Sequence, residues 1–360
     1  MAGLRVLVSL VWPIAFGLRA PLAGSRRLAS RVSVKTVFID GEAGTTGLQV
    51  RQRLATHQGI QVISVPGEGD EARANRKDSK IRREMINSAD AVVLCLPDDA
   101  AIEAVSLVDS DVKIVDASTA HRVGVSGWEY GFAEMTKGQR ERIQAATFVA
   151  NPGCYATGFI GSARPLVDAG LLRPDARLSV SAISGYSGGG NALAAIHQAP
   201  GGAEPWGAYG FGLNHKHLPE MAFHSRLASE PAFLPAVGAF AQGMVVSTLL
   251  HYDDALMLPG SASGEALWEA LAKHYEGDSC VTVVPYGEAG AKDLLERGSF
   301  LSPTRLNGSN KLEIFVFAND QKRTAAIVAR LDNLGKGASG AAVQNLNLLL
   351  GLDESAGLDL

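Results

Sequence analysis

The sequence is poor in cysteine, in charge and in metal-binding spacings, and each shortage removes a class of protein. Only three cysteines occur in 360 residues, without the spacing of a disulfide framework, so we expect a reducing compartment and no disulfides. The formal net charge is -4, and no basic excess points to a nucleic-acid partner. Neither C-x-x-C nor H-E-x-x-H spacing is present, so no metal site is predicted.

The first 33 residues also lack something, because no acidic residue precedes Asp40. Their arginines and serines are typical of an organelle transit peptide. The apolar run 6–18, which Pro13 interrupts, suits a secretory signal instead, but it is too short and too broken for a membrane span. A start codon assigned too far upstream is the third interpretation, with the protein beginning near Val32 or Val34.

What the sequence does contain includes one cysteine in a setting that suits a nucleophile. Cys154 follows an Asn-Pro-Gly turn that ends an apolar strand and opens a helix-like run. Gly153 is expected to take the backbone angles of a sharp turn, and the free amides of a helix start should lower the thiol pKa. Cys95 and Cys280 stand beside apolar runs and suit a packing role. For Cys154 the pattern alone leaves catalysis and packing open.

The segment before this cysteine predicts a dinucleotide-binding fold. Residues 34–40 have the pattern of a buried strand, residues 41–47 form a glycine-rich loop, and a helix-like run covers 48–54. Such a loop brings the backbone and a helix N-terminus close to a pyrophosphate. Further strands are expected at 61–65, 91–96 and 113–116. Strands that alternate with helical stretches predict a parallel doubly wound sheet.

The end of the second expected strand favours NADP over NAD. Ser64 stands where an NAD site usually has an acidic residue, and Arg73, Arg76 and Lys77 follow it. Acidic residues share this loop, so a solvated surface loop is the alternative interpretation.

A second polar cluster lies downstream and indicates acid–base chemistry. His215 and His217 flank Lys216, and Glu220 follows three residues later. Histidine titrates near neutral pH, so either imidazole suits proton transfer. Metal binding and a plain polar loop are the alternatives.

Taken together, these motifs resemble the N-acetyl-gamma-glutamyl-phosphate reductase family, in particular its shorter bacterial type. The motifs that carry the resemblance occur in unbroken order at residues 38–41, 94–99, 116–122, 130–134, 151–155, 184–190, 215–220 and 332–340. The resemblance covers nearly the whole chain from about Val34 onward. It turns Cys154 from an open alternative into an expected nucleophile.

The resemblance implies that NADPH reduces N-acetyl-L-glutamyl 5-phosphate, a step of arginine biosynthesis. Cys154 is then expected to attack the acyl phosphate and form a thioester, which hydride transfer converts to N-acetyl-L-glutamate 5-semialdehyde. His217 is the implied general acid and base, with His215 as the alternative. The backbone amide at or after Cys154 is the expected oxyanion donor.

The resemblance also implies two sets of contact residues. Cofactor contacts are expected from Gly41, Gly44, Thr45, Thr46, Gly47, Ser64, Arg76, Pro97, Asn333 and Gly337. Substrate contacts are expected from Ser118, Arg122, Tyr186, His215 and Glu220. A surface salt bridge is the alternative for Arg122, and a flexible connection is the alternative for the glycine-rich turn around Tyr186.

The predicted fold class is α/β, with a Rossmann-type doubly wound parallel sheet and a second α+β domain built on a mixed sheet. We expect a leader at 1–33, an NADP-binding domain at 34–150, a catalytic and oligomerisation domain at 151–331, and a C-terminal helix at 332–360 that returns to the first domain. Strands of the second domain are expected at 178–183, 244–250, 281–284, 311–318 and 324–331, the last two as an antiparallel hairpin.

The implied partners are a small acyl phosphate and further copies of the chain, as a homodimer or homotetramer, without nucleic acid or membrane. The expected location is the cytoplasm, or an organelle if the leader is a transit peptide. Three other functions stay open: an aspartate-semialdehyde dehydrogenase-like reductase, a cysteine hydrolase, and an NADP-binding regulatory protein with an idle site.

Overall fold

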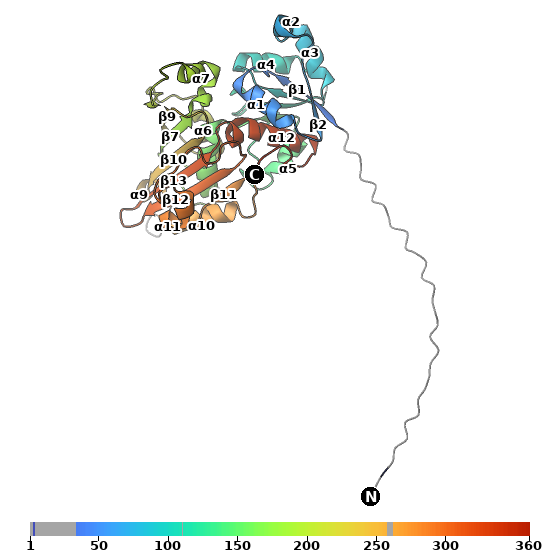
Figure 1. Ribbon diagram of the computed structural model, residues 1–360. Coiled ribbons are helices and arrows are strands. Elements are labelled where there is room, and N and C mark those ends of the chain that lie inside the picture. The colour runs from blue at the N-terminus through green and yellow to red at the C-terminus, as the bar shows by residue number, and fades with distance from the viewer. Residues whose placement is uncertain (1–2, 4–33, 110, 258–261) are drawn as a thin grey trace. The chain divides into compact units, whose positions relative to one another are not determined.

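The computed structural model describes residue 3 and residues 34–109, 111–257 and 262–360. The three interpretations of the leader at 1–33 lie outside the described residues, apart from Gly3. Residues 34–360 contain two sheets with helices packed on them (Figure 1).

The first sheet is parallel throughout, as the alternating pattern predicts. Across the sheet its strands are β2 (Ile60–Ile63), β1 (Lys35–Asp40), β3 (Ala91–Leu94), β4 (Lys113–Asp116), β6 (Phe148–Ala150) and β5 (Trp128–Tyr130). All neighbouring pairs are parallel, which confirms the doubly wound sheet. The short strand β5 was not predicted.

Helices cover both faces of this sheet. One buried cluster joins the strands to α1 (Thr45–Leu54), α5 (Gln139–Ala145) and α12 (Gly340–Leu350). A second cluster, on the opposite face, joins them to α2 (Gly69–Asn75), α3 (Ser79–Ser88) and α4 (Asp98–Ser106). Val37 belongs to the first cluster and Phe38 to the second, because successive side chains of a strand alternate between faces. The chain therefore ends by returning α12 to the sheet with which it began.

The second sheet is mixed, as predicted. Its strands are, in order, β11 (Val281–Val283), β12 (Leu312–Asn319), β13 (Thr324–Leu331), β10 (Met244–His251), β7 (Ser179–Gly185), β9 (Ala232–Gly238) and β8 (Trp206–Ala208). The antiparallel hairpin of β12 and β13 is confirmed, with Leu312 opposite Leu331. Strands β8 and β9 were missed, since β8 has three residues and β9 contains Pro235, which argues against a strand inside a sheet.

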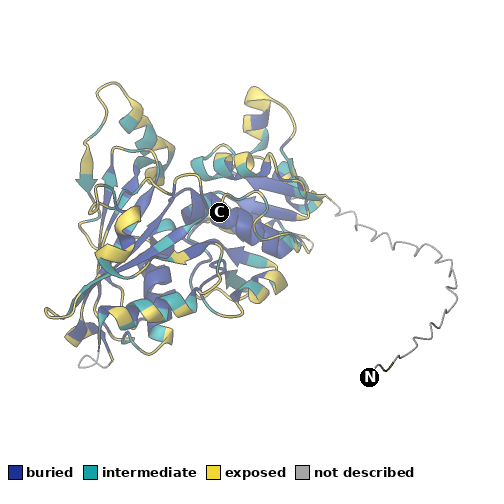
Figure 2. Ribbon diagram, turned by 60° about the horizontal axis from the view of Figure 1, so that its bottom comes forward, coloured by how far each residue is buried: buried dark blue, intermediate teal, exposed yellow. Residues whose placement is uncertain are grey.

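The two faces of the second sheet differ in how they are covered. The largest buried cluster lies between one face and α6 (Cys154–Asp168), α8 (Leu218–Ser225) and α10 (Gly264–His274). On the other face, a smaller cluster links β12 and β13 to α11 (Gly287–Ala291). Two further helices are α7 (Gly190–Gln198), which has no buried residue, and α9 (Tyr252–Ala255). Figure 2 shows the burial concentrated in the strands and the central helices.

The two sheets are formed by separate stretches of the chain. All strands of the first sheet fall within residues 35–150, and those of the second within 179–331. The domain boundaries themselves stay a prediction. Among the described residues, no helix combines the length and the apolar character that a bilayer crossing requires.

Candidate active site

A cavity of about 1000 Å³ lies between segments that follow strands of the first sheet and segments of the second sheet. The carboxyl ends of parallel strands are the usual place for such a crevice. Eight of the predicted site residues line it: Thr45, Thr46, Arg122, Cys154, His215, His217, Asn333 and Gly337. Nine do not: Gly41, Gly44, Gly47, Ser64, Arg76, Pro97, Ser118, Tyr186 and Glu220.

Cys154 is the first residue of α6, directly after the turn that leaves β6. Gly153, the residue before the helix, has φ of -75° and ψ of 147°, angles that any residue adopts. The prediction that this turn needs special backbone angles is therefore wrong. A side chain is excluded for another reason: a Cβ on Gly153 would lie 2.6 Å from Arg122 Nη1 and 2.7 Å from His217 Nε2. Glycine lets the turn approach these two side chains closely.

The predicted low pKa of the Cys154 thiol is also wrong. Burial raises the pKa of Cys154 to about 11, and this outweighs the amide of Tyr155 and the charge of Arg122, which both lower it. The thiol is therefore protonated at neutral pH. A helix N-terminus stabilises a thiolate, but here its effect is smaller than the cost of desolvating the charge.

The imidazole of His217 complements this protonated thiol. Burial lowers the pKa of His217 well below its ordinary value, and the nearby charges of Arg122 and Lys216 act in the same direction. Its ring is therefore neutral at pH 7 and able to accept a proton. Within the described part of the chain, His217 Nδ1 has no hydrogen-bond partner. His215 is half-buried beside it and accepts a hydrogen bond from the His217 backbone amide at 3.2 Å.

Glu220 lies behind these residues and holds the turn in place. Its side chain is 1% exposed. Its Oε1 accepts from the Gly153 amide at 2.8 Å and from the Tyr130 hydroxyl at 2.7 Å, and its Oε2 accepts from Arg122 Nη1 at 3.1 Å. Both oxygens are thus occupied by the protein itself. Arg122 also donates to the Ala117 carbonyl, while its buried Nε finds no hydrogen-bond partner among the described residues.

Comparison with known proteins identifies the family. The second half of the chain, residues 154–333, matches the family model described as semialdehyde dehydrogenase, dimerisation domain. N-acetyl-gamma-glutamyl-phosphate reductase 2 of Nostoc sp. is 50% identical over 330 residues, which cover 89% of this chain and 98% of that protein. The reductase of Rhizobium leguminosarum bv. trifolii is 47% identical over 320 residues, covering 87% and 98%. The chain belongs to the N-acetyl-gamma-glutamyl-phosphate reductase family.

Solved structures outside this reductase family share its fold. Aspartate semialdehyde dehydrogenase from Francisella tularensis superimposes with a TM-score of 0.62 at 13% identity, covering 88% of this chain and 100% of that one. The enzyme from Candida albicans, solved with NADP, gives a TM-score of 0.57 at 13% identity, covering 90% and 99%. At this identity the likeness establishes the common fold of two α/β sheets.

At the other end of the cavity, the glycine loop of this member of the reductase family contributes its two threonines. Gly41 has φ of +92°, and a Cβ there would come within 2.3 Å of the Cys95 carbonyl oxygen, so only glycine suits the position. Thr45 and Thr46 open α1 and line the cavity, whereas the three loop glycines lie outside the lining. Thr45 Oγ1 lies 2.7 Å from Asn191 Oδ1 of α7, which joins the two sides of the cavity.

A cluster of charges stands at the end of β2. Arg51 Nη1 donates to Glu42 and to Ser64 Oγ, both at 2.8 Å. Ser64 donates to the same carboxylate at 3.0 Å, and Arg76 Nε lies 3.5 Å from it. Sequence reasoning identified Ser64 and Arg76 but missed Arg51 and Glu42. The helical spacing of Arg51 on α1 did not show that it faces the end of β2.

Three further predicted residues lie outside the lining. Ser118 is buried and donates to Asp116 at 2.7 Å. Tyr186 stacks on His197, with ring centroids 4.9 Å apart. Pro97 immediately precedes α4. Their predicted contacts with substrate or cofactor stay predictions.

Two tyrosines were missed by the sequence analysis. Tyr155 and Tyr209 line the cavity, and their hydroxyl oxygens lie 3.3 Å apart. The ring of Tyr155 meets His215 and His217 edge-on, at centroid distances of 5.6 and 6.0 Å. The position of Tyr155 next to Cys154 was a usable signal. Tyr209 offered none, because 54 residues separate it from its partner.

Proposed function

We propose that this chain catalyses the NADPH-dependent reduction of N-acetyl-L-glutamyl 5-phosphate to N-acetyl-L-glutamate 5-semialdehyde and phosphate, a step of arginine biosynthesis. The observation that carries the proposal is that a cysteine at a helix N-terminus and a neutral, buried imidazole line one cavity. Membership of the reductase family supports the choice of substrate.

The reaction begins from a neutral pair of groups. As the Cys154 sulfur bonds to the acyl carbon, the thiol proton passes to His217, so no buried thiolate has to exist in advance. The carbon–oxygen bond to the phosphate then breaks, and a thioester remains on Cys154. When bound, NADPH supplies a hydride to an acyl carbon. Protonated His217 finally returns its proton as the carbon–sulfur bond breaks, which regenerates the thiol.

The cofactor end of the cavity suits a dinucleotide with an extra phosphate. The loop 41–47 leads into the N-terminus of α1, where backbone amides favour a pyrophosphate. Arg51, Ser64 and Arg76 gather around Glu42 at the end of β2. The two arginine charges outnumber the single carboxylate, which favours the 2′-phosphate of NADP over the bare ribose of NAD.

Cationic side chains suit the anionic substrate. Arg122 and Lys216 line the cavity beside Cys154, next to His215, whose pKa is lowered by burial and by the charge of Lys216. Arg122 is held by Glu220 on one side and retains a buried Nε without a hydrogen-bond partner in the described residues. We infer that this group binds the substrate phosphate or carboxylate, because charge-assisted hydrogen bonds recognise both.

The same geometry allows an aspartate-semialdehyde dehydrogenase-like reaction, which the shared fold favours as the second candidate. The deciding experiment monitors phosphate-dependent reduction of NADP by absorbance. N-acetyl-L-glutamate 5-semialdehyde and L-aspartate 4-semialdehyde serve as alternative substrates. Rapid reduction with the first alone supports the proposal, reduction with the second alone assigns the sister reaction, and no reduction with either overturns both.

The second sheet also suits association with a second copy of the chain. Leu234 of β9 and Leu249 of β10 are 41% and 47% exposed, and the register places them on one face with Ser181 and Ser179. Exposed apolar side chains on a sheet face are typical of an interface. We infer a homodimer through this face, or a homotetramer that contains it. Leu249→Lys is expected to shift sedimentation toward the monomer, whereas exchange of exposed Leu48 on α1 for Lys should leave it unchanged.

A further inference from the structure

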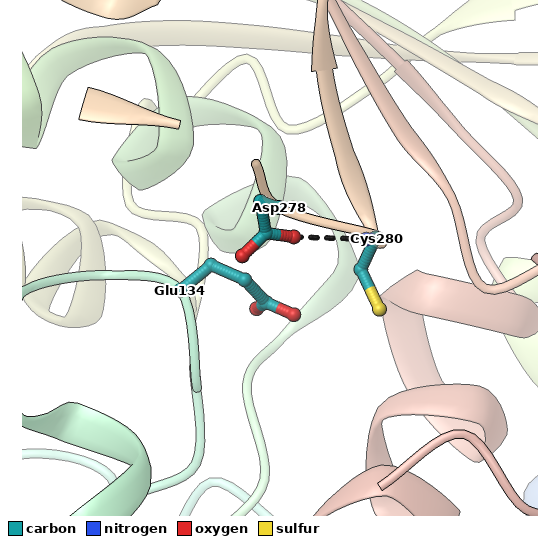
Figure 3. A group of neighbouring side chains, drawn as sticks. All are labelled: Glu134, Asp278 and Cys280. Atoms are coloured by element: carbon teal, nitrogen blue, oxygen red, sulfur yellow. Dashed lines mark hydrogen bonds between the residues drawn. The ribbon is translucent and has the colours of Figure 1, made fainter. Parts of the chain in front are cut away.

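A group of buried polar side chains lies outside the cavity. Glu134, Asp278 and Cys280 point toward one another (Figure 3), and their ligand atoms lie within 4.8 Å of one another, a separation that would suit a metal ion. Three facts oppose metal binding. Lys336 Nζ lies 2.8 Å from both oxygens of Glu134, burial raises the pKa of Cys280 to about 11, and Asp278 already accepts from the backbone amide of Cys280 at 2.8 Å. Two side-chain cations already neutralise the group: Lys336 pairs with Glu134, and Arg140 Nη2 lies 2.8 Å from Asp278.

The Lys336 ammonium uses all three of its hydrogen-bond donors. Its three donors reach Glu134 Oε1 and Oε2 at 2.8 Å and Gln344 Oε1 at 2.7 Å, and the residue is 2% exposed. Burial alone lowers the pKa of Lys336, but the adjacent carboxylate of Glu134 raises it above its ordinary value, and the pKa of Glu134 is lowered in turn, so both groups are charged. Such a pair is rigid, because each partner left alone would be a buried unpaired charge.

The lysine belongs to a π-helical turn, Gly335–Ser339, that touches the catalytic cysteine. A Cβ on Gly337 would lie 2.8 Å from the Cys154 Cβ, so the backbone of the turn packs directly against that residue. The Ala338 carbonyl accepts from Asn151 Nδ2 at 3.0 Å, which ties the turn to the loop before Cys154. Both contacts are made by residues within two positions of Lys336. π-Helical turns inside helices are frequent at functional sites.

We propose that Lys336 is a positioning residue for the reaction: its ion pair with Glu134 presses the turn 335–339 against Cys154 and Asn151 and so fixes the thiol in the cavity. This inference rests on the proposed role of Cys154 as nucleophile. The pair itself touches neither substrate nor cofactor, since neither Lys336 nor Glu134 lines the cavity.

The proposal predicts that turnover and thiol reactivity change in opposite directions when the pair is lost. Without the ion pair, the turn is expected to move away from Cys154. Water then reaches the thiol, which is buried in the wild-type protein. The pKa of Cys154 then falls from about 11 toward its ordinary value, which raises the thiolate fraction at pH 8. Turnover falls, because the thiol is no longer held for attack. A general loss of stability would not speed alkylation of this one cysteine in folded protein.

The test compares Lys336→Met with Arg330→Met. Arg330 is an equally buried cation that donates to Glu313 at 2.7 Å and to the carbonyls of Leu294 and Ser302, none of which lines the cavity. Iodoacetamide modification of Cys154 is followed by peptide mass spectrometry. The pH is varied from about 7 to about 10, because ordinary thiols have a pKa of about 8 to 9. Lys336→Met is expected to lower kcat roughly 100-fold, the cost of a displacement of about 1 Å.

The same variant should raise the alkylation rate of Cys154 at pH 8 by about tenfold, which corresponds to a fall of about one pKa unit. Arg330→Met should leave both the alkylation rate and the kcat of folded protein unchanged. Unchanged kcat and alkylation in folded Lys336→Met would overturn the inference, and so would equal effects of the two variants.

Two further variants keep the test decisive. If Lys336→Met does not fold, Lys336→Met combined with Glu134→Gln removes both charges, and the same two readouts apply to it. Cys154→Ser separates this inference from the proposed function. If that variant retains turnover, the nucleophile assignment itself fails; if it is inactive while the Lys336 variants behave as wild type, only the positioning role fails.

Discussion

The two ends of the cavity are built in different ways. At the cysteine end, Gly153, His217 and Glu220 are buried, and Glu220 hydrogen-bonds both Gly153 and Arg122. At the cofactor end, the lining includes the half-buried Thr45 and Thr46, the glycines 188–190, and a helix without buried residues, α7. The charges beside this end are also accessible, since the Arg51 side chain is 46% exposed.

This difference shows where the protein itself sets the geometry and where a ligand must complete it. A desolvated, hydrogen-bonded cluster costs folding free energy but holds reacting groups in place before substrate arrives. An exposed cluster is screened by water and salt, so each of its charges contributes little alone. Substitutions at the cysteine end should therefore act on kcat, and those at the cofactor end on affinity.

The strongest test replaces the nucleophile. Cys154→Ser should lower turnover by at least about 1,000-fold while NADPH binding is unchanged, because the thioester cannot form but the cofactor end is intact. Turnover and quenching of protein fluorescence by NADPH are the measurements. Cys95→Ser is the control, since Cys95 does not line the cavity. Full activity of Cys154→Ser would remove the thioester mechanism.

The next test separates the two histidines. His217→Asn should lower kcat roughly 100-fold to 1,000-fold, the usual contribution of a general acid and base. His215→Asn, a change of the same kind in the adjacent ring, should lower kcat less than about tenfold. The half-buried ring of His215 accepts a hydrogen bond from the His217 backbone and does not transfer the proton itself. Steady-state kinetics give both values. The opposite ranking would assign proton transfer to His215.

A smaller effect on the reaction rate is expected when Glu220, which lies behind the catalytic residues, is replaced. Glu220→Gln should lower the free energy of unfolding by about 3 kcal/mol, because it leaves Arg122 buried without its carboxylate. It should also lower kcat about tenfold, since Gly153 loses a charged acceptor. Glu313→Gln, which breaks the Arg330 pair, is the matched control. Denaturant unfolding and kinetics decide: equal kcat losses in both variants would show that Glu220 has no specific effect on the turn.

The smallest effect is expected at the cofactor end. Arg51→Ala should weaken NADPH binding about fivefold and leave NADH binding unchanged, as estimated from about 1 kcal/mol for an exposed charge. Arg73→Ala provides the control, because Arg73 is strongly exposed and, among the residues that the structure describes, pairs only with Asp70 in the same helix. Fluorescence titration with both cofactors is the measurement. Equal weakening of NADPH and NADH would argue against a 2′-phosphate contact.

Local patterns were sufficient for most of the fold. Apolar runs of four to eight residues bounded by glycine and polar residues led to β1, β4, β10 and β13 with bounds within about two residues. Strand β9 was missed because its Pro235 argues against a strand. In the fold Pro235 lies opposite Ala182 of β7, a pairing that no local pattern reveals. The three-residue strands β5 and β8 were missed, whereas β11, which has the same length, was predicted because it lies in an apolar run.

The site was predictable where a single segment contains the chemistry. Cys154 and His217 each stand in a short motif of characteristic composition, and both line the cavity. Arg51, Tyr209 and Glu134 act through partners far away in the sequence, and nothing local distinguishes them from ordinary surface or core residues. The sequence analysis also gave the wrong reason why glycine is needed at position 153. The side chains that leave no room for a Cβ there, Arg122 and His217, come from other segments of the chain.

The sequence by itself determined most of the strands, the glycine loop, the cysteine at a helix start and the histidine pair, because each depends on residues adjacent in the chain. The tertiary structure alone decided the protonation states of Cys154 and His217, the burial of Glu220 and the contact of the turn 335–339 with the nucleophile. These properties depend on desolvation and on charges brought together from distant segments, which only the folded chain assembles.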